Sequence, residues 1–406
     1  MQLNEKSTPV IIGGLRSPFG KHCGALSTVR PDDLAGDIIR QLVEKYYISP
    51  DMIEDVILGC ANQAGEDSRN VARNAILASG LSENIPGITV NRLCASGLAA
   101  VVDAARAVMS SEGELFIAGG VESMTRAPFV MSKADSAFSR ELKTFDTTIG
   151  ARFPNPKVLK NFGAHSMPET GDEVARLMNI SRSEADLFAE SSQQKYAQAK
   201  QRAFYNDEMA PVALPQKKGE STPSIFAADE YPRPDTNLEK LSKLNALFPN
   251  GVVTAGNASG INDGAAALLI GNMAAANKIG CKPIGIIRGS ASYGIAPKIM
   301  GLGPVEAARR LLKRLNLTLS DMDVIEINEA FASQVLACLK QLEIPFTDSR
   351  VNPNGGAIAL GHPLGASGAR LALTAARNLQ ETQGRYALVS LCVGMGQGLA
   401  MVIERC

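Results

Sequence analysis

The sequence predicts an α/β fold made of two related halves. One observation is that, in both halves, short apolar segments alternate with segments whose apolar residues recur at helical spacing. This alternation is typical of mostly parallel sheets that helices cover on both faces. The other observation is an internal repeat, in which the second half copies a pattern of the first. The length of 406 residues agrees with both, because about 100–200 residues per domain allow two to four domains.

The same order of elements, helix then strand, is expected twice in each half. Helical spacing predicts helices at Leu34–Val43, Leu98–Val108, Val305–Leu315 and Ala369–Leu379. The apolar strands expected after them, in the same order, are Val56–Leu58, Leu115–Ala118, Val324–Ile327 and Ala387–Leu391.

The internal repeat has two parts. Ala-Ser-Gly at 95–97 with Ala-Ala-Arg at 104–106 recurs with the same spacing at 366–368 and 375–377. Asp-Met at 51–52 with Asp-Val-Ile at 55–57 resembles the run at 321–325. Either match alone would be weak, but the two together, in the same order, indicate a duplicated α/β unit.

The middle of the chain, from about residue 125 to residue 260, differs from both halves. Helices are expected there only around Glu169–Leu177 and Ser183–Gln201. The prolines of this region are Pro128, Pro154, Pro156, Pro168, Pro211, Pro215, Pro223, Pro232, Pro234 and Pro249. It is therefore predicted to be a loop-rich insertion, a kind of segment that often carries binding contacts.

Composition excludes several classes of function. Lys+Arg and Asp+Glu both number 41, and this balance argues against a nucleic-acid or anionic-membrane partner. Only three histidines occur, His22, His165 and His362, too few for a histidine-rich metal site. The seven cysteines show no CxxC spacing, which argues against structural zinc and favours reduced thiols in the cytoplasm. The uncharged run Tyr386–Ile403 is interrupted by glycines and predicts two strands joined by a turn, not a membrane span.

A cysteine, Cys94, stands between an expected strand and an expected helix, in Asn-Arg-Leu-Cys-Ala-Ser-Gly. The positive end of a helix dipole favours a thiolate there, and the small residues that follow leave room for a substrate. The segment predicts a nucleophile, although a buried cysteine that fills a tight turn would have the same pattern.

The second half carries its own candidate, His362, within the glycine-rich run Val351–Gly368. If the halves are duplicates, Ala366 corresponds to Ala95, and His362 then lies just upstream of the segment equivalent to Cys94. The two side chains could then meet between the halves. The alternative is a glycine-rich turn with an incidental histidine.

Two further candidates follow expected strands. Cys392 is followed by Gly394, Gly396 and Gly398, and Asn328 begins the run Asn-Glu-Ala-Phe. A thiol beside free glycine N–H groups could move a proton and help to stabilise an oxyanion. This glycine run is not a dinucleotide fingerprint, because no acidic residue can follow it about twenty positions later.

Two further motifs are Gly-Gly-Val-Glu-Ser-Met at 119–124 and Thr-Ala-Gly-Asn-Ala-Ser-Gly at 254–260. Together with the motifs above, they make the sequence resemble thiolases over essentially its whole length. The resemblance implies a five-layered αβαβα fold with two duplicated core domains and an inserted loop domain. It places the N-terminal core at 1–124, completed by 262–283, the insertion at 125–261 and the C-terminal core at 284–406. The insertion would supply CoA-binding and oligomer contacts.

The resemblance also implies a mechanism. Cys94 would be the acylated nucleophile, His362 would accept its proton, and Cys392 would exchange a proton with the substrate carbon. His362 and a water held by Asn328 would form one oxyanion site, and the N–H groups of Cys94 and Gly394 would form the other.

Coenzyme A would be a substrate, and neither a permanently bound cofactor nor a metal is implied. Its implied contacts are Ala255 and Ser259 in the loop 254–260, with Met167, Ala330 and Phe331 around the pantetheine and Met300 closing the acyl pocket. Lys217 and Lys218 could meet the nucleotide phosphates, although paired surface lysines are usually only solvated.

The segments 59–70, 145–150 and 166–170 resemble 3-oxoadipyl-CoA thiolases. Such a substrate has a distal carboxylate, so an arginine is expected nearby, and the candidates are Arg69, Arg126 and Arg152. Two departures from that subfamily leave the acyl chain open: Ala151 stands at a usually aromatic position, and Asn245-Ala246 replaces Arg-Pro. Ser166 stands where biosynthetic thiolases have histidine, which favours a degradative enzyme.

The alternatives are a short-chain acetoacetyl-CoA thiolase, a fatty-acid 3-ketoacyl-CoA thiolase and a non-catalytic acyl-CoA-binding homologue. A decarboxylating ketoacyl synthase would lack a cysteine at position 392. The resemblance implies a homotetramer, with a dimer as the alternative. The polar residues Met1–Pro9 and the C-terminal Glu404-Arg405-Cys406 carry no recognisable address, which again gives the cytoplasm as the expectation.

Overall fold

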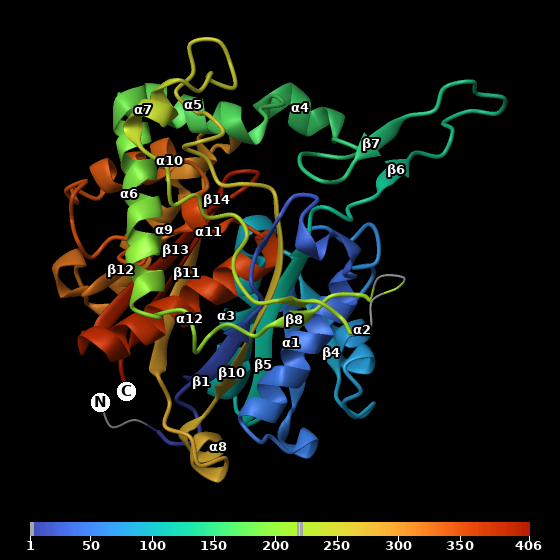
Figure 1. Cartoon of the computed structure of the whole chain (residues 1–406), viewed down its shortest axis with the longest axis vertical. Helices are drawn as coiled ribbons and strands as arrows, with labels where there is room; N and C mark the ends of the chain where they lie inside the picture. Colours follow the sequence, from blue (N-terminus) through green and yellow to red (C-terminus); the bar gives the residue numbers. More distant parts are fainter. Residues whose placement is uncertain (1–3, 217–218, 220–221) are drawn as a thin grey trace.

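A single large sheet organises the structure, a computed structural model that describes residues 4–216, 219 and 222–406 (Figure 1). Its strands follow the order β12-β13-β14-β11-β1-β10-β5-β3-β4, with β2 paired to β10. The strands are β1 (Val10–Arg16), β2 (Gly20–Lys21), β3 (Asp55–Gly59), β4 (Gly87–Val90), β5 (Leu115–Ser123), β10 (Asn262–Gly271), β11 (Gly285–Gly294), β12 (Val324–Ile327), β13 (Tyr386–Val393) and β14 (Gln397–Glu404).

The sheet consists of two half-sheets with the same pairing, joined only where Val10 and Ile11 of β1 pair with β11. In the first half, β3 and β5 are parallel, whereas β5–β10 and β10–β1 are antiparallel. In the second half, β12 and β13 are parallel, whereas β13–β14 and β14–β11 are antiparallel. Even the parallel β3–β4 pair has a counterpart, a parallel bridge between Ile325 and Val351. This correspondence confirms the duplication that the repeat predicts.

Helices complete five layers. Two central helices, α3 (Ser96–Met109) and α12 (Leu364–Thr382), share one apolar core with strands of both half-sheets. A second core lies under the outer helices α1 (Pro31–Lys45) and α2 (Val71–Ala78). A third lies under α9 (Gly303–Leu315) and α10 (Ala332–Gln341). Small and apolar residues on nearly every side of α12 suit this central position.

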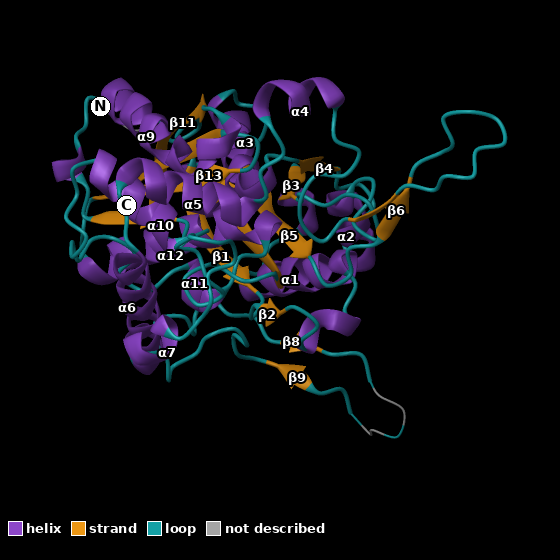
Figure 2. Ribbon diagram, turned by 90° about the horizontal axis from the view of Figure 1, so that it is seen from above, coloured by secondary structure: helices purple, strands orange, loops and turns teal. Residues whose placement is uncertain are grey.

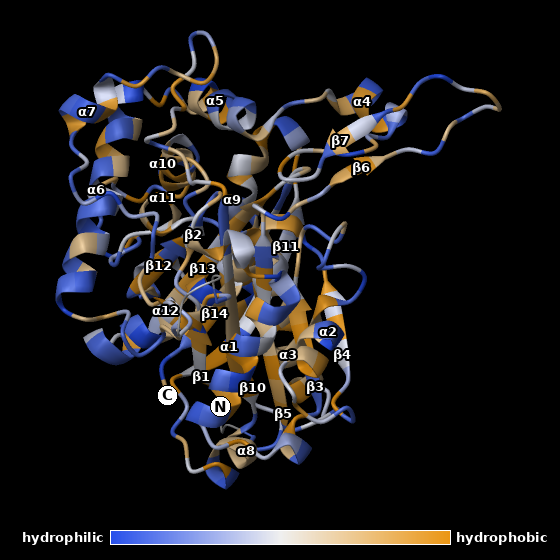
Figure 3. Ribbon diagram, turned by 45° about the vertical axis from the view of Figure 1, so that its right-hand side comes forward, coloured by the Kyte–Doolittle hydropathy of each residue, from blue (hydrophilic) through white to orange (hydrophobic). Residues whose placement is uncertain are grey.

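The strands of the large sheet are mostly apolar and lie inside, whereas hydrophilic residues appear on the outer helices and loops (Figure 3). Tyr386–Ile403 forms β13, a glycine turn and β14, as predicted. Among the described residues, no helix is long and apolar enough to cross a membrane.

The insertion leaves the first half after β5 and returns at β10. It holds the paired strands β6 (Phe129–Met131) and β7 (Thr144–Asp146), whose hairpin projects from the body (Figures 1 and 2). Its other elements are α4 (Pro156–Phe162), α5 (Met167–Met178), α6 (Arg182–Gln201), β8 (Val212–Ala213), β9 (Ile225–Phe226) and α7 (Leu238–Ser242). The two helices expected in this region are confirmed as α5 and α6, but the expectation that helices occur only there is wrong, because the short helices α4 and α7 also form, each begun by an asparagine N-cap. The domain boundaries at 124, 261 and 283 stay a prediction.

Two short helices complete the chain, α8 (Met273–Lys278) and α11 (Ala357–Leu360).

Candidate active site

Cys94 lies in a short 3-10 helix, Leu93–Ala95, between β4 and α3. The preceding loop is fixed by Asn91, whose side-chain amide donates to the Ala61 carbonyl (3.0 Å) and whose Oδ1 accepts from the Leu93 N–H (2.9 Å). The Cys94 side chain is partly buried, and burial raises the pKa of its thiol. The N–H groups of Gly394 and of Cys94 itself lower that pKa, because they stabilise the thiolate. The resting thiol is therefore protonated, and its sulfur faces two backbone donors.

His362 lies between α11 and α12, in the loop that the duplication pairs with the Cys94 segment. Its backbone N–H donates to Oδ1 of Asn262 (2.9 Å), and its ring contacts Ser367 on one side and Asn328 on the other. The side chain is buried, and burial, with the charge of Arg370, lowers its pKa to about 3. The imidazole is therefore neutral near pH 7 and can accept a proton.

Asn328 directly follows β12, and its backbone N–H donates to the Ser390 carbonyl of β13 (2.9 Å). Its Nδ2 lies 3.2 Å from Nε2 of His362. Its Oδ1 is buried and has no hydrogen-bond partner among the described residues. Buried amide oxygens usually have a partner, so this atom is placed to hold a water or a substrate group beside the imidazole.

Cys392 is buried near the end of β13, and Gly394 follows in the turn to β14. Burial raises the pKa of the Cys392 thiol well above its ordinary value, and the proximity of Cys94 raises it further. A Cβ at Gly394 would lie 3.2 Å from Cδ1 of Leu93 and 3.8 Å from Sδ of Met167. This turn therefore contacts the residue before the predicted nucleophile, and the five predicted catalytic residues lie near the ends of β4, β12 and β13 and just before α12.

Most of the predicted CoA and acyl contacts lie in one small apolar cluster, which also contains Cys392. Its members are Val253, Ala258, Met300, Ala330, Phe331 and Cys392, with Met167 and Val252 packed against it. Ser259 joins it through its N–H and its hydroxyl, which both donate to the Ala330 carbonyl (3.0 and 3.2 Å). The structure thus brings Met167, Ser259, Met300, Ala330 and Phe331 to the loop of Cys392.

Ala255 instead lines a neighbouring cavity of about 190 Å³. The cavity is lined by Gln193, Tyr231, Arg233, Asp235, Thr236, Lys240, Leu241, Leu244, Ala255, Gly256 and Ile358. Because Ser259 is only four residues from Ala255, the loop 254–260 leads from this cavity to the apolar cluster. Sequence reasoning missed the cations Arg233 and Lys240, which stand in a proline-rich stretch without a motif. Lys217 and Lys218, named instead, lie outside the described residues.

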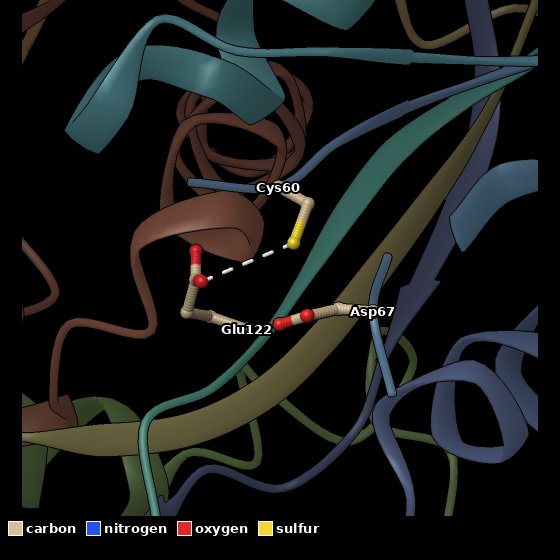
Figure 4. A group of neighbouring side chains, drawn as sticks. All are labelled: Cys60, Asp67 and Glu122. Atoms are coloured by element: carbon tan, nitrogen blue, oxygen red, sulfur yellow. Dashed lines mark hydrogen bonds between the residues drawn. The ribbon is translucent and has the colours of Figure 1, made fainter. Parts of the chain in front are cut away.

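A buried cluster of Cys60, Asp67 and Glu122 supports the nucleophile loop (Figure 4). The Glu122 carboxylate accepts from the N–H groups of Ala61 (3.0 Å), Asn62 (2.8 Å) and Gly365 (2.8 Å). It therefore ties the end of β5 to the loop after β3 and to the start of α12. Desolvation raises the pKa of Glu122 to about 7, although these three donors favour the ionised form.

Comparison with protein families gives two matches that together span most of the chain. Residues 9–274 match the family described as "Thiolase, N-terminal domain". Residues 281–405 match the family described as "Thiolase, C-terminal domain".

Individual proteins are similar over nearly the full chain. The Escherichia coli K12 protein named 3-oxoadipyl-CoA/3-oxo-5,6-dehydrosuberyl-CoA thiolase is 55% identical, covering 97% of this chain and 98% of its own. A Pseudomonas putida beta-ketoadipyl-CoA thiolase is 54% identical with the same coverage. Among solved structures, the Bacillus anthracis acetyl-CoA acetyltransferase superposes with a TM-score of 0.91 at 34% identity, covering 99% of this chain and 100% of its own.

Proposed function

The chain belongs to the thiolase family and is an acyltransferase, and from that premise we propose that its substrate is 3-oxoadipyl-CoA, which it cleaves with CoA. The products would be acetyl-CoA and the CoA ester of the remaining four-carbon dicarboxylate. The observation that carries this proposal is the 54–55% identity, over 97% of the chain, to relatives named for this substrate. The solved relative named for a different substrate reaches only 34%.

In the first step, His362 takes the proton of Cys94, and the thiolate attacks the 3-keto carbon. The imidazole is neutral at pH 7 and so has a lone pair for this proton, and the negative charge that forms on the substrate beside it stabilises the imidazolium. The ketone oxygen becomes an oxyanion, and the N–H groups of Cys94 and Gly394 stabilise it. The same two donors lower the pKa of the Cys94 thiol in the resting site, which supports their orientation towards this point.

In the second step, the bond between C2 and C3 breaks. Its electron pair moves onto C2 and the thioester oxygen, while the acyl group stays on Cys94. The protonated His362 and a water held by Asn328 stabilise the enolate oxygen, and the unpartnered Oδ1 of Asn328 supports a water at this point. Cys392 gives its proton to C2 and releases acetyl-CoA, and the proton on His362 then returns to the Cys392 thiolate.

In the third step, CoA takes the acyl group from Cys94. His362 accepts the proton of the CoA thiol, and the CoA thiolate attacks the acyl-cysteine carbonyl. The Cys94 thiolate leaves and recovers its proton from His362, so that the enzyme returns to its starting state. CoA is a substrate in this scheme, and no permanently bound cofactor takes part.

CoA would lie along the loop 254–260. Its pantetheine would contact Met167, Ala330 and Phe331 in the apolar cluster, and Met300 would close the acyl end. Its nucleotide would lie at the cavity that Ala255 lines, where Arg233 offers positive charge to phosphate groups, whereas Lys240 is paired with Asp235 of the same cavity.

We further propose a cytoplasmic homotetramer. The hairpin of β6 and β7 supports assembly, since it projects from the body and exposes Phe129, Met131, Phe138 and Leu142 (Figure 2). Large apolar side chains gathered on a projecting segment are typical of a protein–protein contact. The seven cysteines are free thiols, which is typical of proteins in a reducing compartment.

The experiment that tests the function compares three substrates, acetoacetyl-CoA, a longer unbranched 3-oxoacyl-CoA and 3-oxoadipyl-CoA, each with CoA. Loss of the 3-oxoacyl enolate absorbance reports cleavage, and Cys94→Ala gives the background rate. We expect 3-oxoadipyl-CoA to have the highest kcat/KM. A higher kcat/KM for acetoacetyl-CoA or for the longer chain would show that the proposed substrate is wrong. The absence of any CoA-dependent cleavage would indicate a non-catalytic acyl-CoA-binding protein.

A further inference from the structure

Cleavage of 3-oxoadipyl-CoA requires recognition of a second negative charge, the distal carboxylate of the acyl chain. This carboxylate lies three carbons beyond the carbon that becomes bonded to Cys94, so its partner must lie near the nucleophile loop. An arginine whose guanidinium has no internal partner is the side chain best suited to it. Four arginines are candidates: Arg92 lies in that loop, and Arg69, Arg126 and Arg152 lie in the segments that follow β3, β5 and β7.

Two of these arginines already have partners. Arg126 donates to both carboxylate oxygens of Glu66 (2.5 and 2.6 Å) and to the Ser27 carbonyl (3.0 Å). Arg92 donates to Oε1 of Gln397 (3.2 Å). Arg126 would have to break its ion pair with Glu66 to bind a substrate, and the loss of that pair would cancel most of the binding free energy gained from the substrate carboxylate.

Arg69 and Arg152 differ in burial. Neither takes part in a hydrogen bond or salt bridge within the described part of the chain. Arg69 is exposed, so water can solvate its charge. Arg152 is partly buried, in the segment between β7 and α4. A partly buried guanidinium without a partner is costly unless an anion joins it, so Arg152 is the stronger candidate.

A chain of hydrogen bonds links the segment of Arg152 to the nucleophile loop. Asn62 donates through Nδ2 to the Thr147 carbonyl (3.2 Å), five residues before Arg152. The neighbouring Ala61 carbonyl accepts from Asn91, three residues before Cys94. Thr147 is itself buried and donates to the Pro128 carbonyl (2.6 Å), which holds the segment against the core.

One buried carboxylate, that of Asp67, interacts with the charge of Arg152. Burial raises the pKa of Asp67, and the positive charge of Arg152 partly opposes that rise. Asp67 accepts from the Gly65 N–H (2.9 Å) but forms no salt bridge with Arg152. Asp67 is therefore near enough to orient the guanidinium by its charge without occupying the hydrogen-bond donors.

From these contacts we propose that Arg152 binds the distal carboxylate of the acyl chain and so selects a dicarboxylic 3-oxoacyl-CoA. The inference rests on the proposed function, because it names the residue that recognises the proposed substrate. Arg152 acts here as a specificity residue and takes no part in breaking the carbon–carbon bond.

The test compares 3-oxoadipyl-CoA with 3-oxohexanoyl-CoA, which has the same chain length and a methyl group in place of the carboxylate. Arg152→Ala is expected to lower kcat/KM for 3-oxoadipyl-CoA about 10- to 100-fold, the range for a charge-assisted hydrogen bond. It should change kcat/KM for 3-oxohexanoyl-CoA less than about threefold. Arg152→Lys keeps the charge but loses the planar donor pair, so its kcat/KM for 3-oxoadipyl-CoA should lie between those of the wild type and Arg152→Ala.

The matched control is Lys157→Ala, which removes the same charge from an exposed position at the start of α4. It should leave kcat/KM unchanged for both substrates. Equal loss for both substrates in Arg152→Ala, or no loss for either, would overturn the role of Arg152. A wild-type enzyme that prefers 3-oxohexanoyl-CoA would instead overturn the proposed substrate, so the two failures are distinguishable.

Discussion

The Nδ1 atom of His362 lies 2.6 Å from Oγ of Ser367, and this contact fixes which ring nitrogen carries the hydrogen. Oγ of Ser367 also lies 2.9 Å from the Pro363 carbonyl, which can only accept. The single hydroxyl hydrogen must go to that carbonyl, so Nδ1 must donate to Ser367. Nε2 then carries the lone pair, which accepts from the amide of Asn328 in this structure, and Nε2 is the ring nitrogen that can be protonated.

Replacement of Ser367 tests this tautomer. Ser367→Ala removes the acceptor at Nδ1, so a fraction of the rings can place the hydrogen on Nε2, where it blocks proton transfer from Cys94. We expect kcat of thiolysis to fall about 10- to 100-fold with KM nearly unchanged, because the loss concerns a single hydrogen bond in the reacting state. Steady-state kinetics with 3-oxoadipyl-CoA measure both constants.

The control for this variant is Thr374→Val on the same helix. Thr374 is buried two turns after Ser367, and its hydroxyl has no partner among the described residues. Valine keeps its shape, so kcat should stay within about twofold. A similar loss of kcat in both variants would point to the packing of α12 and contradict the tautomer argument.

Cys392→Ala should separate carbon chemistry from thiol exchange. Without this thiol, no group delivers the proton to C2, and both cleavage and condensation should fall at least about 100-fold. Exchange of an acetyl group between acetyl-CoA and labelled CoA, through Cys94 and His362, should persist because it breaks no carbon–carbon bond. If exchange and cleavage fell by the same factor, Cys392 would not be the separate acid and base.

The buried imidazole also predicts a pH dependence of stability. The folded pKa of His362, about 3, lies below the ordinary value of 6.5, so only the unfolded chain takes up this proton between these values. The stability is fully present above pH 6.5 and is lost as the pH falls towards 3. At pH 5 the loss is about 2 kcal/mol.

Urea unfolding at pH 7 and pH 5, at one protein concentration, measures this loss. His362→Asn has no ionisable group, so it should lose about 2 kcal/mol less than the wild type between these two pH values. Parallel losses in the two proteins would contradict the low pKa of His362.

The features of the structure that repeat or alternate along the chain could be predicted from the sequence. The repeat at 95–97 and 366–368 predicted equivalent helices, and α3 and α12 indeed lie together in the central layer. The same correspondence predicted that the segments of Cys94 and His362 meet. Glycine-flanked residues at strand ends, such as Cys392 and Asn328, were also visible, because sharp turns require particular residues.

The insertion was the least predictable part because its contacts are long-range and follow no period. Asp229 binds the buried Arg16 (2.7 Å), and Asp186 accepts from Asn257 (2.8 Å), although neither carboxylate belongs to a motif. The cations Arg233 and Lys240 were missed for the same reason. The contact of Ser367 with His362 lies inside a recognised motif, but spacing alone does not show that the hydroxyl meets Nδ1.

The projecting hairpin predicts an effect of surface charge on assembly. Phe138→Asp places a carboxylate at the exposed tip between β6 and β7, where an apolar side chain would be buried against another subunit. Analytical ultracentrifugation should show a tetramer for the wild type and smaller species for the variant. Tyr47→Asp, at an exposed aromatic outside the hairpin, should leave the tetramer intact. A tetramer in all three proteins would exclude the hairpin tip from the interface.

The junction of the two halves predicts an unusual effect of a glycine in a helix. Gly97 lies in the first turn of α3, where alanine would normally stabilise the helix by up to about 1 kcal/mol. A Cβ at this position would lie 2.3 Å from the Gly365 carbonyl oxygen and 3.0 Å from the Ala369 nitrogen, both in the backbone of α12. Gly97→Ala must therefore push the two central helices apart, next to both Cys94 and His362.

We expect Gly97→Ala to lose about 1–3 kcal/mol of stability, measured by urea unfolding, and to lose activity with it. Gly294→Ala is the matched control, because a Cβ at the end of β11 meets no atom within 4 Å. It should leave stability and activity within experimental error. A Gly97→Ala protein as stable as the wild type would mean that the halves do not approach this closely, and the meeting of their catalytic loops would then need another explanation.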